Sequence, residues 1–301
     1  MALDDQQVRT AMFAHLERLT ALHPEGVTSA DLNTFTVAGR ALKLVVQPGI
    51  WKPAELNAAL TIRTTYTAPN QLPPYQDDIA MGGLIKYAYR GTDPNHSDNR
   101  ALRTAMQEQR PLAYFIGVAK SVYQAHFPVF IVGERPEQQA FLVAVDEAQR
   151  LVDPELLEKL TPDSRSYLER LTKIRLHQPV FRARVLQAYE TQCAICRLKH
   201  ADLLDAAHIV RDADEGGLPV VPNGLALCKI HHAAYDRNII GVRPDLVIDV
   251  RRDILAEIDG PMLKHGIQEM AGVRITVPRQ RAAQPNRENL DQRYRQFLGI
   301  G

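Results

Sequence analysis

The sequence predicts an α+β protein with two domains. Short segments rich in β-branched and aromatic residues fill residues 40–146, helical spacing dominates residues 147–190, and all three cysteines lie between residues 193 and 228. A chain of 301 residues is long enough to form two hydrophobic cores. The expected parts are a first domain at 1–147, a helical linker at 148–180 and a second domain at 181–301.

The first domain is expected to begin with helices and continue as strands. Apolar residues recur at helical spacing through residues 6–22, and a short helix capped by Ser29 is expected within residues 28–35. A further helix is expected at 99–108. The expected strands are 42–46, 58–66, 84–90, 112–118, 128–133 and 140–145, several of them separated by turn signals. These strands predict a mostly β, barrel-like domain.

After residue 146, a helical segment is followed by a mixture of expected strands and helices. Residues 147–190 carry leucines at helical spacing, with a break at Thr161-Pro162. Beyond them, the expected elements are a short strand that ends near His208, one or two strands within 238–250, a strand at 273–278 and a terminal helix at 289–298.

The cysteines form a pattern that is typical of a metal site. Cys193 and Cys196 are spaced C-x-x-C, and Cys228 and His231 repeat this spacing as C-x-x-H. Two such pairs, a few tens of residues apart, match a tetrahedral structural zinc site. We therefore expect Zn²⁺ at these four residues, in a reducing compartment and without a disulfide framework.

Three residues within this frame carry a resemblance to a nuclease family. His208 and Asn223 lie between the two pairs, and His232 directly follows His231. This order resembles the HNH nucleases, the ββα-metal family. The resemblance implies that His208 is the general base, that Asn223 orients the loop or the base, and that His232 binds a catalytic Mg²⁺ or Mn²⁺. Hydrolysis of a phosphodiester needs such a base and such a cation.

One position departs from the family pattern. Many members carry Asp or His, a second metal ligand, directly before the base, where this chain has Ala207. Asp205 lies two residues from Ala207 and therefore on the same face of a strand, which makes it our candidate for the missing ligand. Asp236 follows His232 by one helical turn and is expected to orient it.

A second resemblance lies in residues 75–102. The matching positions are Tyr75, Asp77, Asp78, Gly82, Tyr89-Arg90-Gly91 and Asn99-Arg100-Ala101-Leu102. This pattern resembles the SRA or YDG domains, which are PUA-like barrels that bind modified cytosine in DNA. The resemblance implies a flipped base stacked by Tyr75 and by Tyr87 or Tyr89, with its exocyclic amine bound by Asp78. Arg63, Arg90, Arg100 and Arg182 are the candidates for DNA backbone contacts.

The composition and charge of the chain limit how it can bind nucleic acids or membranes. The formal net charge is +1, so basic residues can form only a local phosphate-binding face. No apolar run has the length of a membrane span, and the polar, acidic N-terminus is unlike a signal peptide. We therefore expect a cytoplasmic protein without a membrane partner.

Together the two resemblances imply a type IV-like, McrA-like modification-dependent restriction endonuclease. Its partner would be double-stranded DNA that carries 5-methylcytosine or 5-hydroxymethylcytosine. One HNH site cuts one strand, so double-strand cleavage favours a homodimer. Two alternatives stay open. One is a non-catalytic reader of modified DNA. The other is an HNH nuclease whose first domain binds another modified base, phosphorothioate DNA or a nucleotide signal.

Overall fold

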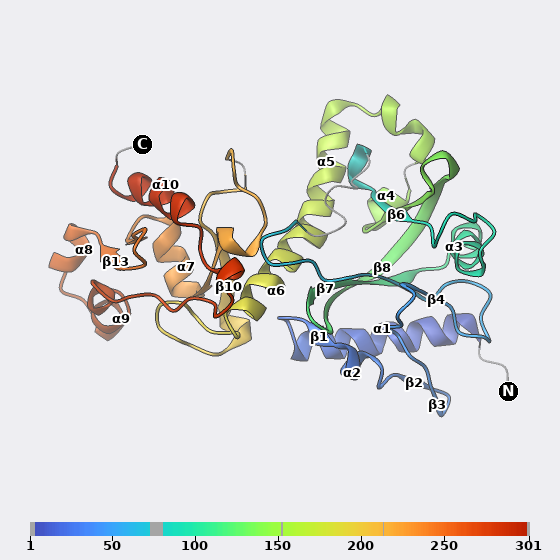
Figure 1. The fold of residues 1–301 in the computed structure, drawn as a ribbon, viewed down its shortest axis with the longest axis horizontal. Helices are drawn as coiled ribbons and strands as arrows, with labels where there is room; N and C mark the ends of the chain where they lie inside the picture. The colour runs from blue at the N-terminus through green and yellow to red at the C-terminus, as the bar shows by residue number, and fades with distance from the viewer. Residues whose placement is uncertain (1–3, 73–80, 152, 213, 300–301) are drawn as a thin grey trace. The chain divides into compact units, whose positions relative to one another are not determined.

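The computed structural model describes residues 4–72, 81–151, 153–212 and 214–299 (Figure 1). The chain divides into two compact units. Unit 1 contains residues 1–67 and 73–180, and unit 2 contains residues 68–72 and 181–301. The helical segment that we expected to link two domains therefore belongs to unit 1 up to residue 180, and a short segment from the first part of the chain belongs to unit 2.

Unit 1 is built on a seven-stranded sheet with the order β4-β5-β7-β8-β9-β6 and with β1 paired to β8. Strands β5 and β7 are parallel, and the other pairs are antiparallel. The bounds are β1 Val27–Thr28, β4 Ile50–Trp51, β5 Thr61–Thr64, β6 Ile85–Ala88, β7 Leu112–Ala119, β8 Val122–Arg135 and β9 Ala140–Ala144. A small hairpin of β2 (Thr36–Val37) and β3 (Arg40–Ala41) lies outside this sheet.

Most of the strands expected in unit 1 are present, but one is wrong. Residues 42–46 form no strand, although Leu44 is buried in the core as an apolar strand residue would be. The Asn33 side chain explains the difference, because its Oδ1 atom accepts hydrogen bonds from the backbone N–H groups of Leu44 and Val45, at 2.9 and 3.0 Å. A side-chain amide thus takes the place of a neighbouring strand.

The longest helix of unit 1 covers one face of the sheet. Helix α1 (Asp5–Leu22) runs along β7 and β8 (Figure 1), and its residues Val8, Met12 and Leu16 are completely buried. They join Phe115 and Tyr123 of the sheet in one hydrophobic cluster. The 6–22 periodicity therefore marks a core-facing stripe.

The other helices of unit 1 begin at recognisable caps. Helix α2 is capped by Thr28, whose side chain accepts from the backbone N–H of Asp31, so the prediction of Ser29 as the cap is wrong. The break at Thr161-Pro162 is confirmed, because Thr161 caps α5 and Pro162 is its first residue. The bounds are α2 Ser29–Leu32, α3 Ser97–Gln107, α4 Glu147–Arg150 and α5 Pro162–Thr172, and α6 Gln178–Ala188 continues into unit 2.

The sheet curls into a half-barrel because its two ends approach each other at Tyr87. The hydroxyl of Tyr87, on the end strand β6, shares a hydrogen bond between the carbonyl oxygens of Gly49 and Arg63, at 3.1 and 3.0 Å. Gly49 directly precedes β4, the strand at the other end of the sheet, and Arg63 lies on β5 beside it. Tyr87 also packs edge-to-face on Tyr114 of β7.

Two strands and one helix form the centre of unit 2. Strand β10 (Leu204–His208) pairs antiparallel with β11 (Gly224–Cys228), and α7 (Lys229–Asp236) follows directly. A second hairpin, β12 (Ile240–Val242) and β13 (Ile248–Val250), closes the unit together with α8 (Arg252–Ala256), α9 (Pro261–Gly266) and α10 (Arg287–Phe297). The apolar residues of both hairpins and of α10 share one buried cluster.

The strand that we expected at 273–278 is wrong. Arg274 forms a single bridge to Val247, and the next backbone N–H groups turn to different partners. Ile275 donates to the carbonyl oxygen of Leu246, and Thr276 donates to that of Ala194. Because these partners lie on separate segments, no ladder can continue.

The segment 68–72 is bound to unit 2 by a buried arginine. Arg184 of α6 is 2% exposed, and its Nη2 atom donates to the carbonyl oxygens of Ala68 and Gln71, at 2.8 and 3.0 Å. The backbone N–H of Val221 donates to Pro69. These bonds make the segment part of the unit 2 structure.

None of the helices in the described ranges combines the length and the apolar character that crossing a bilayer requires.

Candidate active site

The structure brings the two metal-type pairs of unit 2 together. One ligand atom from each of Cys193, Cys196, Cys228 and His231 lies within 4.8 Å of the other three, and the cysteines form no disulfide. The Cys196 and Cys228 sulfurs are 3.9 Å apart. Two sulfurs bound at about 2.3 Å in a tetrahedron around Zn²⁺ would be separated by about 3.8 Å. The donor set and its spacing therefore fit a structural zinc ion.

The orientation of His231 is fixed from outside the cluster. Its Nε2 atom lies 2.7 Å from the carbonyl oxygen of Gly266, to which it can donate, and its Nδ1 atom lies 3.1 Å from the Cys228 sulfur. Such a bond sets the tautomer of a metal-binding histidine. Hydrogen bonds from Cys193 and Cys196 hold the pKa of the Cys228 thiol well below its usual value, which favours the thiolate that a metal needs.

His208 is the last residue of β10 and pairs with Gly224. Its ring stacks on Phe181 of α6, with ring centroids 4.0 Å apart and planes inclined by 18°. A Cβ atom at Gly224 would lie 2.9 Å from the Phe181 ring and 2.5 Å from Val185, so only glycine allows α6 to pack this closely. The stack orients the imidazole that we expect to be the base.

Asn223 holds the connection between β10 and β11. It is 1% exposed, its Nδ2 atom donates to the carbonyl oxygens of Val210 and Leu218, and its Oδ1 atom accepts from the backbone N–H of Val210. Asn289 of α10 donates to the same oxygen. Of the two roles that the resemblance implied for Asn223, these contacts correspond to orienting the loop.

Asp205 and His232 come together between β10 and α7. The Asp205 Oδ2 atom lies 3.7 Å from His232 Nδ1, and the other ring nitrogen of His232 lies 3.4 Å from Asp236. Both side chains of the pair are only partly buried. The structure thus brings Asp205, His232 and Asp236 together. The aromatic contact of His208 is with Phe181.

The charges around Asp205 stabilise its carboxylate. Burial alone would raise the pKa of Asp205, but the nearby His232 imidazole and the Lys229 ammonium outweigh this effect and hold its pKa well below the usual range. The Asp205 carboxylate in turn raises the pKa of His232. A carboxylate and an imidazole at this separation are donors that fit Mg²⁺ or Mn²⁺.

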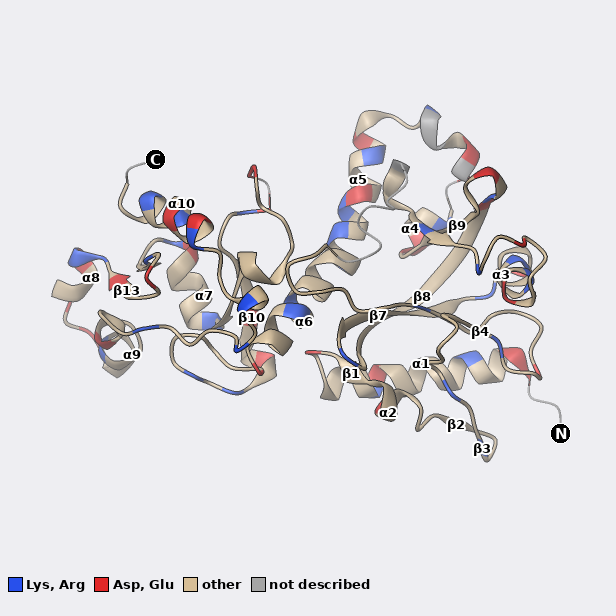
Figure 2. Ribbon diagram, in the orientation of Figure 1, with Lys and Arg blue, Asp and Glu red and all other residues tan. Residues whose placement is uncertain are grey.

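Two contacts of Asp205 were not foreseen. Lys229 places its Nζ atom 2.6 Å from Asp205 Oδ2, and the Nε atom of Arg182 lies 3.3 Å from Oδ1. Arg182, which we expected at the DNA backbone, also donates to the carbonyl oxygens of Ala201 and Leu204. Figure 2 shows basic residues on α6 beside β10. The sequence offered no signal for these pairs, since the partners are distant along the chain.

Comparison with known proteins agrees with this geometry. Residues 193–243 match the model of the family described as HNH endonuclease. The chain carries an HNH endonuclease domain. The match contains the expected zinc ligands and also His208, Asn223 and His232.

Solved structures and curated proteins give weaker comparisons. A structure described as "Modification dependent TagI restriction endonuclease" shares 16% identity, with 90% of this chain and 92% of that chain covered and a TM-score of 0.29. Another, described as "Structure of the Type IV phosphorothioation-dependent restriction endonuclease ScoMcrA", shares 15% identity, with 62% and 51% covered and a TM-score of 0.23. A search of the curated proteins finds no match.

Outside the HNH domain, unit 1 has a pocket of about 330 Å³ where the two ends of its sheet approach. This volume is within the size range of small-ligand sites, about 300–1,000 Å³. Its lining includes Gly49 and Arg63 on one side and Lys86, Tyr87 and Tyr89 on the other. Of the expected base-binding residues, Tyr75 and Asp78 lie outside the described residues.

Tyr87 and Tyr89 line this pocket but are held firmly by their neighbours. Each is 8% exposed. The Tyr89 hydroxyl donates to Glu134, which also forms two hydrogen bonds with Arg103, at 2.6 and 2.9 Å. Burial first, and then the bond with Glu134, raises the pKa of Tyr89 to about 12, so the hydroxyl stays a donor at neutral pH. The pocket therefore has a rigid aromatic wall.

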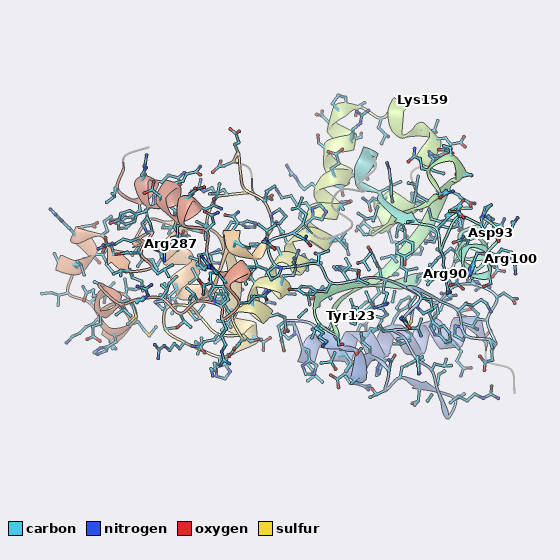
Figure 3. The ribbon with its side chains drawn as sticks, viewed as in Figure 1. Arg90, Asp93, Arg100, Tyr123, Lys159 and Arg287 are labelled. Atoms are coloured by element: carbon cyan, nitrogen blue, oxygen red, sulfur yellow. The ribbon has the colours of Figure 1, made fainter. Side chains whose placement is uncertain are left out.

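The three arginines expected at the DNA backbone in unit 1 all have protein contacts. Arg63 donates to the Tyr123 hydroxyl and to the Gln47 carbonyl oxygen, Arg90 pairs with Asp98, and Arg100 donates to the carbonyl oxygen of Asn95. Arg100 of α3 lies near Arg90 and Asp93 (Figure 3). Arg90 and Arg63 also line the pocket.

The Asn-Arg-Ala-Leu motif has a structural role that the sequence did not reveal. Asn99 is completely buried and accepts from the backbone N–H of Arg90. It donates to the carbonyl oxygens of Arg90 and Asp93. Asn99 thus fixes the loop that follows β6.

Proposed function

We propose that this protein is a DNA endonuclease that acts on DNA carrying 5-methylcytosine or 5-hydroxymethylcytosine. The HNH domain hydrolyses the phosphodiester, and the pocket of unit 1 receives the flipped base. The observation that supports nuclease action best is the placement of His208, Asn223 and His232 around one Cys₃His frame inside an HNH family match. The pocket between the ends of the unit 1 sheet supports base recognition.

Each of the proposed site residues in the HNH domain has a separate role. His208 accepts a proton from the attacking water, in an orientation set by the Phe181 ring. Asp205 and His232 would hold a divalent ion, which neutralises charge developing on the phosphate when it is bound. Asp236 orients His232 through its second ring nitrogen, and Asn223 keeps the β10–β11 connection in place. A structural Zn²⁺ at the four metal-type residues would join the hairpin to α7.

The pocket of unit 1 supplies specificity in the same proposal. A base turned out of the duplex needs aromatic faces and a small number of polar groups. Tyr87 and Tyr89 provide aromatic surface, and by resemblance Tyr75 stacks on the base while Asp78 accepts a hydrogen bond from its exocyclic amine. Arg63, Arg90 and Arg100 contribute positive charge for the backbone, and Arg182 supports the nuclease site. Cleavage of both strands would need two HNH sites, which supports a homodimer.

A tryptophan at Ala88 should block base recognition. Ala88 is exposed on β6 and lines the pocket, so an indole in this position would occupy space in the pocket without removing a charge. Fluorescence anisotropy without Mg²⁺ or Mn²⁺ would compare duplexes with unmodified, 5-methylated and 5-hydroxymethylated cytosine. The wild type should bind one modified duplex at least about tenfold more tightly, and Ala88→Trp should lose this preference.

Lys120→Trp is the matched control, because Lys120 is exposed in the turn after β7 and does not line the pocket. It should bind as the wild type does. Equal binding of all three duplexes by the wild type would refute recognition of modified cytosine while leaving the nuclease proposal intact. The remaining candidates for unit 1 would then be phosphorothioate DNA, another modified base or a nucleotide.

A second candidate function is a non-catalytic reader of modified DNA. The presence of Ala207 favours it, because a buried alanine stands where many HNH nucleases have a metal ligand. In this case the HNH domain would be a zinc-stabilised appendage, and modified duplexes would be bound without being cut.

A further inference from the structure

Lys229 is the first residue of α7 and lies beside the proposed catalytic groups. Its side chain is 54% exposed, and its ammonium group lies 2.6 Å from the Oδ2 atom of Asp205. A lysine carries a compact charge on a flexible stem with four methylene groups. The contact is therefore close, but the side chain is free to move toward solvent.

One oxygen of the Asp205 carboxylate lies near both Lys229 and His232. Asp205 Oδ2 contacts Lys229 Nζ and also lies 3.7 Å from His232 Nδ1. Under the proposed function, this is the oxygen that joins His232 in holding a divalent ion. A divalent ion and an ammonium repel each other, so Asp205 cannot keep its close contact with Lys229 while it holds the ion.

Arg182 makes this exchange possible without movement of Asp205. Its Nε atom lies 3.3 Å from Oδ1, the other oxygen of the carboxylate, and its Nη2 atom is fixed by the carbonyl oxygens of Ala201 and Leu204. Arg182 is bound to two backbone carbonyl oxygens, whereas the Lys229 side chain is half exposed. Of the two cations, Lys229 is therefore the one that can leave.

We propose that Lys229 is a phosphate-binding residue of the nuclease site, held on Asp205 until the carboxylate takes up a divalent ion. Lys229 then leaves Asp205 and its ammonium contacts the phosphate of the bound DNA strand. This inference rests on the proposed function of Asp205 and His232. It assigns to Lys229 two measurable effects, because the residue opposes metal binding in the free protein and stabilises the DNA complex when metal is bound.

Lys229→Met tests both effects, since methionine keeps most of the side-chain length and removes the charge. Titration of the full-length, zinc-loaded protein with Mn²⁺ would be followed by electron paramagnetic resonance in the absence of DNA. We expect Lys229→Met to bind Mn²⁺ about two- to fivefold more tightly than the wild type, which is the effect of losing an exposed ion pair. Single-turnover cleavage at saturating Mn²⁺ should fall about tenfold or more, the effect of a lost charge-assisted hydrogen bond.

Two further variants make the result decisive. Lys199→Met is the matched control, because Lys199 is exposed in unit 2, and both of its measurements should equal those of the wild type. Asp205→Asn should weaken Mn²⁺ binding; if it does not, the proposed metal site is wrong. If Asp205→Asn weakens binding while Lys229→Met changes neither Mn²⁺ affinity nor cleavage, or only one of them, the inference about Lys229 is refuted and the metal site stands.

Discussion

Replacement of Cys228 by serine is expected to unfold unit 2 and to leave unit 1 folded. Cys228 is the last residue of β11 and directly precedes α7, so its bond to a metal would tie the hairpin to the helix. Structural zinc contributes apparent binding free energies of about 10–16 kcal/mol, whereas a whole domain is stable by only about 5–15 kcal/mol. A serine hydroxyl is a poor zinc ligand, so the lost zinc-binding free energy should exceed the free energy of unfolding of unit 2.

Unit 1 should survive because it has its own sheet and its own buried cluster around α1. Elemental analysis and limited proteolysis would measure the effect. The wild type should contain one zinc per chain and resist cleavage in unit 2, and Cys228→Ser should lose both properties. Removal of zinc from the wild type by a chelator, followed by its return, is the control for reversibility. Full zinc content and intact unit 2 in Cys228→Ser would contradict the assignment of this ligand.

Replacement of His208 by alanine should abolish cleavage without weakening DNA binding. General bases contribute about 10²–10⁴-fold to such reactions, and the single-turnover rate should fall by this factor. The fold should persist, because β10 is held to β11 by backbone pairing along its whole length, including His208 with Gly224, and this pairing does not need the imidazole. Binding of modified duplexes belongs to unit 1 in our proposal and should remain unchanged.

His200→Ala is the matched control for this experiment. His200 lies in the same unit, is exposed and stands outside the His-Asn-His order. Its cleavage rate should stay within about twofold of the wild type, as is usual for surface substitutions away from a site. A rate for His208→Ala equal to that of His200→Ala would show that another group is the base.

The position of the HNH domain and the grouping of its four metal-type residues could be predicted from the sequence. The reason is physical: metal ligands and their spacing are local, because a knuckle needs two ligands a turn apart and a helix start supplies the second pair. Strand β10 before His208 was also foreseen. The groups that surround Asp205 were not, because Arg182, Lys229 and Asp205 come together through the packing of α6, β10 and α7, which leaves no local pattern.

Unit 1 was predicted less completely. The strands with β-branched and aromatic residues were found, but 42–46 formed none because Asn33 satisfies its backbone N–H groups. The half-barrel closure depends on Tyr87 reaching Gly49 and Arg63 across the ends of the sheet, and such distant contacts cannot be derived from periodicity. Likewise, the role of Asn99 as a buried loop anchor was visible only in the structure.

The most direct test of modification-dependent cleavage is an assay on one plasmid in three forms, unmodified, 5-methylated and 5-hydroxymethylated at cytosine, each with Mg²⁺ or Mn²⁺. We predict cleavage of a modified form only, dependent on the added metal. Equal cleavage of all three forms would contradict recognition of modified cytosine by unit 1. Absence of cleavage with either metal, together with binding of a modified form, would contradict the nuclease and identify the protein as a reader.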